Sequence, residues 1–511
     1  MLVTYVIVRV ASFPADLDVT RAVSHDSGYI GIVARNLLAG RGYVNDAHWL
    51  LFLDPPALPM YYHNANPLYP TLTAAVMAVS GAGPIASGAF LSILGTALSA
   101  IGVFLLVRHF GVSERLAIAC AAVPVLLPPL FRISFTVLPD ALATGLTFCL
   151  LAMVVRAREW WHWVLAGALF GLAWLTRSTA VLVIPAIAVW VIGRRGMHKA
   201  VVAGALCAIG TLVVISPWLV RNARVRGGPF VSDSSFYLLI DYFAKKGGRT
   251  PDELYRSLGP PPANADLADL MQTAVAEVPE TLTRSAAAIA QSNVAAAIVL
   301  MAAMLCGAWC VWHRRRGVEL AAACAVFVTM VAAFAIRGDE LEPRYLAVCF
   351  ALLGLLMLAP FGAPVTRRTM WLRAPVLLYA TVFLGPQLWR ITTLMRAPDP
   401  RLQVFQVAAK SLHSGIADTS AVVSHLPYLF TLYTGRHAVS PPYPGKQELL
   451  RIMQRYHASH LFLPADRFAN YYRGGPASLG PELTAVAPRP HYLVLQRRPS
   501  TTHDLPRRSR I

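Results

Sequence analysis

The sequence predicts a polytopic α-helical membrane protein with a small α/β domain near its C-terminal end. Of its 511 residues, 56% are hydrophobic and only 14% are charged, and the mean hydropathy is +0.52. Soluble globular chains carry a much larger share of charged residues. In addition, apolar windows of roughly the 20 residues that a helix needs to cross a bilayer recur along most of the chain.

We count eleven such windows. They are residues 1–13, 84–107, 116–132, 138–155, 161–176, 179–193, 200–218, 293–312, 318–336, 345–361 and 373–394. The first window is too short to cross as written. We interpret it as a clipped span, because Arg9 and the absence of a small-residue cleavage site disfavour a cleaved signal peptide.

The loops between the windows alternate in charge, and this alternation predicts the orientation. Lys and Arg accumulate on the cytoplasmic side of a membrane. The basic loops contain Arg108, Arg115, Arg156, Arg158, Arg194, Arg195, Lys199, Arg314, Arg315, Arg316, Arg367, Arg368 and Arg373. The outward set then comprises loops 14–83 and 219–292, the turns 133–137 and 337–344, the surroundings of Arg177, and the chain after about residue 395. We expect a multi-pass protein of the cytoplasmic (inner) membrane.

The formal charge of +19 indicates membrane lipids as partners, because basic loops of such a chain meet anionic headgroups. We expect no nucleic-acid partner. The seven cysteines all lie in apolar stretches, which excludes a plausible disulfide framework or cysteine metal cluster.

Three domains are expected. Residues 1–395 form the transmembrane domain, residues 396–500 an extracytoplasmic α/β domain, and residues 501–511 a disordered basic tail. The α/β assignment rests on "ADTSAVVSHLPYLFTLYTGR" and "HYLVLQRRP", where short β-like runs alternate with helical periodicity. The 219–292 loop carries a Pro-rich break between helical patches at 251–258 and 266–290.

The first outer loop contains "HDSGYIGIVARNLLAGRGY", which predicts an interfacial helix. Ile30, Val33, Ala34 and Leu37 recur at helical spacing, and Gly40 and Gly42 end the pattern. Asp26 or Ser27 is the expected N-cap. A helix cap is therefore the simplest explanation of Asp26.

Further charges gather at the same predicted outer face. Asp140 stands at the mouth of the fourth span, with a cap after Pro139 as its simpler explanation. Arg177 interrupts two apolar windows, and a snorkelling arginine is the alternative there. Arg221 and Arg344 add cations against the positive-inside trend. Such carboxylates and guanidinium groups suit a general base and a bidentate phosphate site.

The order of these motifs resembles the GT-C superfamily of membrane glycosyltransferases. The motifs that support this resemblance are "HDSGY", "NPLYPTLTAAVMAVSG", "LPDALATGLTF", "GLAWLTRSTA", "SPWLVRNARVRGGPFV" and "EPRYLAV". They look closest to the branch with protein O-mannosyltransferases and the aminoarabinose transferase of lipid A, which use polyprenyl-phosphate sugars. The resemblance implies that Asp26 is the catalytic base, Asp140 a second acid, and Arg344 with Tyr345 a pair near the donor phosphate. From their charge at the outer face, we expect Arg221 and Arg177 to be further phosphate contacts.

One departure concerns metal binding. Many relatives carry two adjacent acids in the first loop, whereas Ser27 follows Asp26 here. Asp26 and His25 alone offer few ligands for a divalent metal ion, so these residues do not support a metal cofactor. His48 and His63 are read as solvated loop histidines rather than zinc ligands. His25, His63 and Tyr29 remain further site candidates.

These observations predict an inverting glycosyltransferase with an outward-facing active site. Its donor would be a polyprenyl-phosphate sugar, and its acceptor a glycan, a lipid or a protein. A transporter or lipid-linked sugar flippase is the first alternative, since ionisable groups in membrane helices also mark translocation paths. A scaffold subunit of an envelope-assembly complex is the second.

Overall fold

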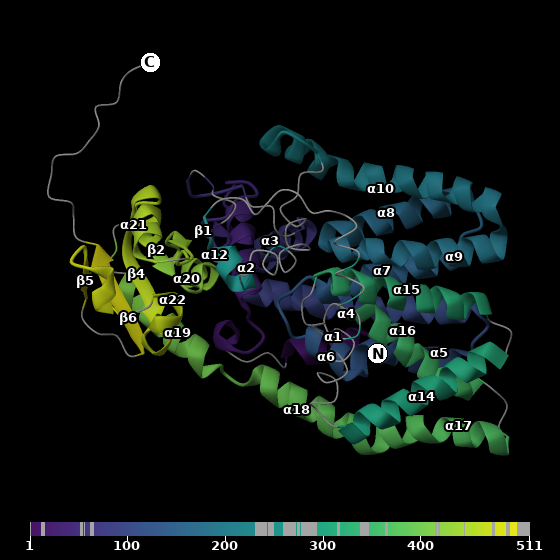
Figure 1. Ribbon diagram of the computed structural model, residues 1–511. Coiled ribbons are helices and arrows are strands. Elements are labelled where there is room, and N and C mark those ends of the chain that lie inside the picture. Colours follow the sequence, from purple (N-terminus) through teal and green to yellow (C-terminus); the bar gives the residue numbers. More distant parts are fainter. Residues whose placement is uncertain are drawn as a thin grey trace. The chain divides into compact units, whose positions relative to one another are not determined.

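The chain divides into two compact units in this computed structural model (Figure 1). A helical unit comprises Met1–Val44, Tyr61–Thr250 and Pro262–Pro400, and a sheet unit comprises Asn45–Met60, Pro251–Pro261 and Arg401–Ile511. Apart from a few isolated positions, the structure describes residues 2–11, 16–51, 57–61, 66–229, 250–258, 294–313, 317–337, 347–362, 366–413, 420–443, 445–472, 476–486 and 491–497. The predicted tail 501–511 and most of the predicted helical patch 266–290 lie outside these ranges.

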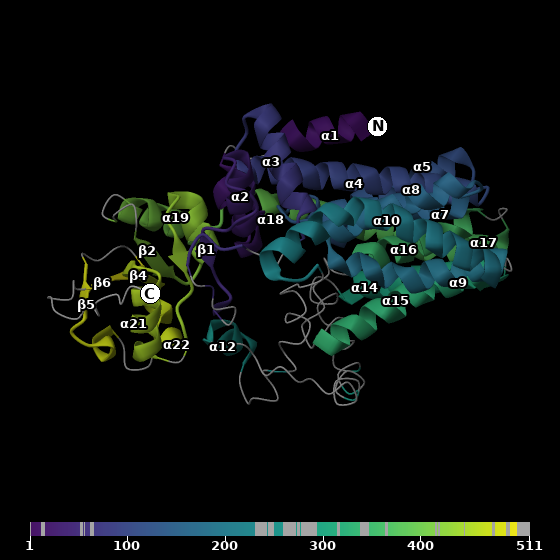
Figure 2. The ribbon, with the colours of Figure 1, turned by 90° about the horizontal axis from the view of Figure 1, so that it is seen from above.

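Every predicted apolar window overlaps a helix or a pair of short helices of the helical unit. In chain order these are α1 (Leu2–Ala11), α4 (Pro84–His109), α5 (Glu114–Leu126), α6 (Pro128–Ile133), α7 (Asp140–Arg156), α8 (Trp160–Thr176), η3 (Ser178–Val183), α9 (Ile184–Arg195), α10 (Met197–Arg226), α14 (Val294–His313), α15 (Gly317–Arg337), α16 (Ala347–Leu358), α17 (Arg367–Leu378) and α18 (Gly385–Arg396). A π-helical segment, η5 (Tyr379–Leu384), joins the last two. Figures 1 and 2 show α4, α7 and α8 side by side.

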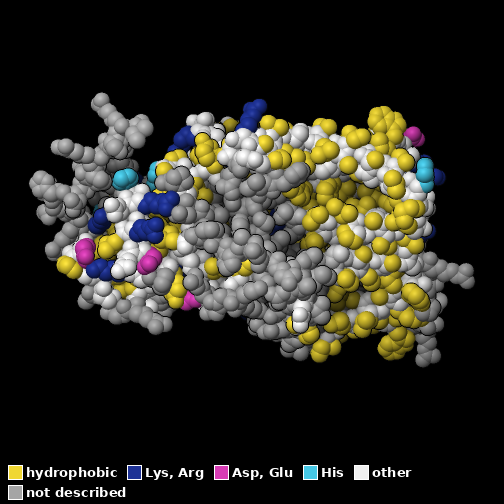
Figure 3. All heavy atoms as spheres, turned by 45° about the horizontal axis from the view of Figure 1, so that its top comes forward, with side chains coloured by type: hydrophobic (Ala, Val, Ile, Leu, Met, Phe, Trp, Pro, Cys, Tyr) yellow, Lys and Arg dark blue, Asp and Glu magenta, His cyan; other side chains and the backbone are white. Residues whose placement is uncertain are grey.

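Three helices among the described residues are long and apolar enough to cross a membrane, namely Pro84–His109, Ser178–Arg195 and Met197–Val225. Helix α10 leaves Val201 65% and Val213 69% exposed, as expected of side chains that face lipid. Hydrophobic side chains likewise cover much of the described surface of this unit in Figure 3. The predicted window 116–132 is broken at Pro128 between α5 and α6. The number of eleven spans stays a prediction.

Glycines bring α4 and α7 into backbone contact at the centre of the helical unit. A Cβ at Gly95 would lie 2.5 Å from the carbonyl carbon of Ala141, and one at Gly102 would lie 2.6 Å from that of Phe148. On the facing helix, Gly145 abuts the Gly95 carbonyl. Small residues permit such close approach between membrane helices. This packing fixes the first turn of α7, and therefore Asp140.

Two shorter helices, α2 (His25–Leu38) and α3 (Leu68–Ser80), lie in the predicted first outer loop. Helix α2 packs against α3 and α4. Its Ile32 and Val33 are both buried, although only Val33 belongs to the predicted apolar stripe. The helix is thus more enclosed than an interfacial helix with one buried face. It ends as predicted, because Gly40 follows with a left-handed φ of +71°.

The sheet unit has six strands in the order β1-β3-β2-β4-β6-β5. The strands are β1 (Ala47–His48), β2 (Ala421–Ser424), β3 (Ala438–Val439), β4 (Ala458–Pro464), β5 (Leu483–Ala485) and β6 (Tyr492–Arg497), with helices α12 (Pro251–Arg256), α19 (Pro400–His413), α20 (Pro427–Thr434), α21 (Lys446–Arg455) and α22 (Phe468–Tyr471). The pairs among β1, β3, β2 and β4 are parallel, whereas β6 is antiparallel to both β4 and β5.

Strand β1 comes from the first predicted outer loop rather than from the segment 396–500. Its residues pair with β3 in the register Ala47 with Ala438 and His48 with Val439. Helix α12, from the second predicted outer loop, also joins this unit. The α/β unit therefore takes in two segments that the sequence analysis assigned to residues 1–395.

The glycine contact between α4 and α7 generates the first prediction. We expect Gly95→Ala to lower the free energy of unfolding by about 1–3 kcal/mol, because the added methyl group must displace the backbone of α7. The measurement is denaturant unfolding of the full chain in detergent micelles. Gly204→Ala on α10 is the matched control, because nothing lies within 4 Å of a Cβ there. Equal stability of both variants would contradict this packing.

Candidate functional site

The first turn of α2 presents Asp26 without using it as a cap. Ser24 is the N-cap, and its Oγ accepts a hydrogen bond of 3.3 Å from the Ser27 backbone N–H. In return, the Ser24 N–H donates to Ser27 Oγ at 3.0 Å. The expectation that Asp26 or Ser27 caps the helix is therefore wrong, because the reciprocal serine pair takes this role. Asp26 is exposed in the first turn, where the helix dipole stabilises a carboxylate.

The same turn of α2 is tied to the loop that leads into α7. Ser27 Oγ donates to the Val137 carbonyl at 3.2 Å, and the Val137 N–H donates to the Ala22 carbonyl at 3.3 Å. Asp140 begins α7 only three residues later. Two carboxylate-bearing segments that are more than one hundred residues apart in sequence thus meet at one end of the helical unit.

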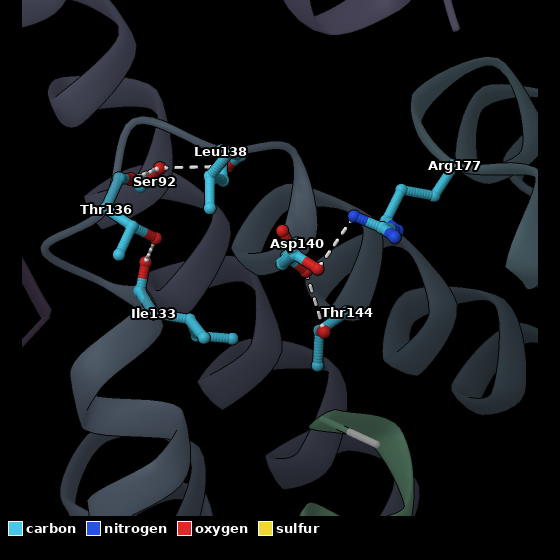
Figure 4. Close-up of polar contacts among 7 residues, drawn as sticks. All are labelled: Ser92, Ile133, Thr136, Leu138, Asp140, Thr144 and Arg177. Atoms are coloured by element: carbon cyan, nitrogen blue, oxygen red, sulfur yellow. Dashed lines mark hydrogen bonds and ion pairs between the residues drawn. The ribbon is translucent and has the colours of Figure 1, made fainter. Parts of the chain in front are cut away.

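Asp140 is held by an ion pair with Arg177 (Figure 4). Arg177 Nη1 lies 2.9 Å from Asp140 Oδ1, and the side chains are 21% and 2% exposed. Asp140 is the first residue of α7, but its side chain forms no cap. Arg177 lies in extended conformation between α8 and η3, and this break in the helix lets its side chain turn toward α7. The capping and snorkelling alternatives are therefore both wrong.

The ion pair lines a small cavity of about 20 Å³ together with Thr144, Thr147 and Thr179. A cavity of this size accommodates about one water molecule. Asp140 Oδ2 faces no hydrogen-bond donor among the residues that the structure describes. The unsatisfied carboxylate oxygen and the three threonines, in a wall that is otherwise largely apolar, fit a site that receives a small polar group.

A second group of contacts anchors the chain that follows α2. The hydroxyl groups of Tyr29 and Tyr43 lie 2.6 Å apart, and burial raises the pKa of Tyr43. Arg221 Nη2 donates to the Tyr43 carbonyl at 2.9 Å. The Arg221 guanidinium carbon also lies 4.7 Å from the centroid of the Trp218 ring. Tyr29 and Arg221, which were predicted separately, therefore belong to one cluster around Tyr43.

The predicted histidines have different environments. Burial lowers the pKa of His25 to about 4, with the neighbouring Asp26 charge acting weakly in the opposite sense, so the imidazole is neutral at pH 7. His48 is completely buried in β1 of the sheet unit, so its prediction as a solvated loop residue is wrong. His63, Arg344 and Tyr345 lie outside the described residues. Within the described part of the chain, no three His, Cys, Asp or Glu side chains form a metal-binding group.

Two residues of this arrangement were missed by sequence reasoning. Ser24 was passed over because Asp26 and Ser27 are equally common cap residues, although the serines at positions 24 and 27 have capping-box spacing. Tyr43 stands in a Gly-rich stretch with no periodicity, so no sequence signal pairs it with Arg221.

Comparisons with known proteins support the resemblance. Residues 63–220 match the family of dolichyl-phosphate-mannose-protein mannosyltransferases. The structure is similar to ArnT from Cupriavidus metallidurans bound to undecaprenyl phosphate, with a TM-score of 0.64, 14% identity and coverage of 98% of this chain and 99% of that one. It is also similar to the oligosaccharyltransferase of Archaeoglobus fulgidus in complex with Zn and sulfate, with a TM-score of 0.60, 14% identity and coverage of 97% and 73%.

No curated protein sequence matches the chain. The family match and the structural likeness together confirm the predicted resemblance to the GT-C superfamily, and the chain has the fold of those membrane proteins.

The buried ion pair generates the second prediction. We expect Arg177→Met to destabilise the full chain by about 3–5 kcal/mol, because it leaves the Asp140 charge buried without a partner. The double variant Asp140→Asn with Arg177→Met should regain much of this loss, since no buried charge remains. Denaturant unfolding in micelles measures Arg177→Met, the single variant Asp140→Asn and the double variant. Additive effects of the two substitutions would show that the side chains do not interact.

Acid sensitivity of His48 is the third prediction. Burial, and secondarily the charge of Arg455, lowers its pKa from 6.5 to about 3. The unfolded chain therefore binds more protons between these pH values, so the contribution of His48 to stability is complete above pH 6.5 and declines as the pH falls toward 3. We expect His48→Leu to flatten the decrease in unfolding midpoint between pH 7 and pH 5. His198→Leu, at an exposed histidine, should leave the decrease unchanged; a reversed ranking would refute this assignment.

Proposed function

Because the chain has the fold of the GT-C glycosyltransferases, we propose that it transfers a sugar from a polyprenyl-phosphate donor to an acceptor hydroxyl. The acceptor is a glycan, a lipid or a protein, and the reaction proceeds at the extracytoplasmic face of the inner membrane with inversion at the anomeric carbon. The observation that carries this proposal is the meeting of the Asp26 turn with the Asp140 loop through Ser27 and Val137, at 3.2 Å. The structural neighbour ArnT, bound to undecaprenyl phosphate, supports the donor class.

In this proposal Asp26 is the general base. A hydroxyl group is a weak nucleophile near neutral pH, so a carboxylate must accept its proton while the new glycosidic bond forms. Asp26 is exposed at the start of α2 and therefore accessible to an acceptor. Ser24 supports this role, because its side chain accepts the hydrogen bond from the first turn of α2, so Asp26 is not needed as the helix cap. The acceptor oxygen attacks the anomeric carbon as the carbon–oxygen bond to the lipid phosphate breaks, which inverts the configuration.

The departing lipid phosphate gains negative charge and requires cations. We assign this role to Arg344, Arg221 and Arg177, and we assign to Tyr345 a hydrogen bond from its neutral hydroxyl group to the phosphate. Preorganised guanidinium groups stabilise developing charge more strongly in a partly dry site than in water. Asp140 supports Arg177 in this assignment, since the 2.9 Å ion pair fixes the direction of its side chain. The hydrogen bond from Arg221 to the Tyr43 carbonyl would likewise fix the direction of the Arg221 side chain.

Side chains alone carry these steps. Asp26 and His25 provide too few ligands for a divalent cation, so no step of the proposed reaction uses a metal ion. His25 is neutral near pH 7, since burial lowers its pKa to about 4, so it adds no positive charge beside the base.

Replacement of Asp26 tests the proposal. We expect Asp26→Asn to reduce the turnover number by about 10²–10⁴-fold, the contribution typical of a positioned general base. Binding of undecaprenyl phosphate, measured by native mass spectrometry, should be unchanged. Asp18→Asn is the matched control, because Asp18 is an exposed carboxylate in the same outer segment. Full activity of Asp26→Asn would remove this residue from the mechanism.

The substrates for this assay come from the cell. Mass spectrometry of lipid-linked sugars and envelope glycans from a deletion strain should show an accumulated donor and a truncated glycan. Passage of the accumulated sugar across sealed vesicles, without formation of a glycoside, would instead favour the flippase alternative.

A further inference from the structure

A second cavity in the helical unit is larger and almost wholly apolar. Its volume is about 290 Å³, and it lies among α4, α5, α7, α9, α14, α15 and α16. Its walls include Val107, Leu151, Trp190, Val326 and Leu355, and Glu319 is its one charged wall residue among those described. Apolar walls of this kind exclude water and accept hydrocarbon.

The volume suits a lipid chain. A cavity of roughly 150 Å³ lined by aliphatic and aromatic side chains holds one benzene molecule, so this cavity provides space for a chain of about ten to twelve carbon atoms. A closed protein core rarely retains a void of this size, because each missing contact weakens the packing.

One end of the cavity lies far from the candidate catalytic residues, whereas its other end, at Val326 on α15, is one helical turn from Met330, which lines the small cavity beside Asp140. Val155, one of its wall residues, is fifteen positions after Asp140 on α7. At the rise of an α-helix this separation is about 22 Å, most of the thickness of a bilayer core. Wall residues Leu106 and Val107 in the last turn of α4, and Glu319 and Leu320 in the first turn of α15, place this end of the cavity at the opposite end of the helical unit.

That end of the unit is basic. Arg108 and Arg115 are both exposed and flank the wall residues Phe110, Val112 and Leu116 on the turn between α4 and α5. Arg194 forms an ion pair with Glu319, which neutralises the charged wall residue. Glu114 is the acid next to Arg115, and the arginines at positions 108, 156 and 195 leave the charge of this end positive.

We propose that this cavity is a binding site for an anionic phospholipid. One acyl chain fills the apolar cavity, and the headgroup phosphate lies against Arg108 and Arg115. Basic pockets between membrane helices attract anionic headgroups by charge, and arginine pairs well with phosphate. The occupant is a lipid of the leaflet at the basic end, because the donor phosphate in the proposed reaction would bind some 22 Å away at the opposite end of α7. The site is independent of the proposed transfer reaction.

Native mass spectrometry of the full chain in micelles tests this site with phosphatidylglycerol as the probe and phosphatidylcholine as the neutral comparison. We expect one phosphatidylglycerol to bind at least fivefold more tightly than phosphatidylcholine. Ala323→Trp, which fills the cavity, should weaken binding by at least fivefold. Ala321→Trp, at an exposed position of the same helix outside the cavity wall, should not.

The headgroup contact is tested separately. The double variant Arg108→Gln with Arg115→Gln should abolish the preference for phosphatidylglycerol over phosphatidylcholine, whereas Lys199→Gln, at another exposed cation near the same end, should retain it. Equal binding of the two lipids by the unmodified chain would overturn the proposal. Displacement of phosphatidylglycerol by undecaprenyl phosphate in wild type but not in Ala323→Trp would also overturn it, because the cavity would then hold the donor chain.

Discussion

The ion pair between Asp140 and Arg177 is the interaction on which the helical unit's candidate site depends. The Asp140 side chain is only 2% exposed, so water stabilises its charge little and the Arg177 guanidinium compensates it instead. The pairing requires the first turn of α7 and the break after α8 to meet, and the glycine contacts between α4 and α7 provide the rigid support. Buried ion pairs contribute little net stability. The ion pair between Asp140 and Arg177 is therefore better explained by its effect on the position of Arg177 than by a contribution to folding stability.

The first outer segment is joined to this pair by hydrogen bonds rather than by charge. Ser27 contacts the backbone of Val137, and Ser24 completes the helix start, so the exposed Asp26 stands on a fixed turn. At the other end of α2, the contact between Tyr43 and Arg221 fixes the chain to α10. Proton transfer by a general base, the role that we propose for Asp26, requires a side chain held on a fixed segment of this kind.

The sequence predicts the local elements of this protein well, but not which distant side chains meet. Apolar windows locate the helices, since each needs a long apolar stretch, and Gly40 marks the end of α2 by its backbone conformation. Asp140 and Arg177 were each singled out, but nothing in a single sequence couples residues that are 37 positions apart. Strand β1 has two residues, too few for any alternating pattern, so its position in the sheet and the burial of His48 could not be predicted. Arg344 and Tyr345, predicted from the family resemblance, lie outside the described residues and stay predictions.

The most direct test of the central claim is an experimental structure of the full chain with undecaprenyl phosphate bound. We predict that the phosphate lies within hydrogen-bonding distance, about 3 Å, of Arg177 or Arg344, at the end of α7 where Asp140 is found. A phosphate bound at the opposite end of α7, beside Arg108 and Arg115, would contradict it.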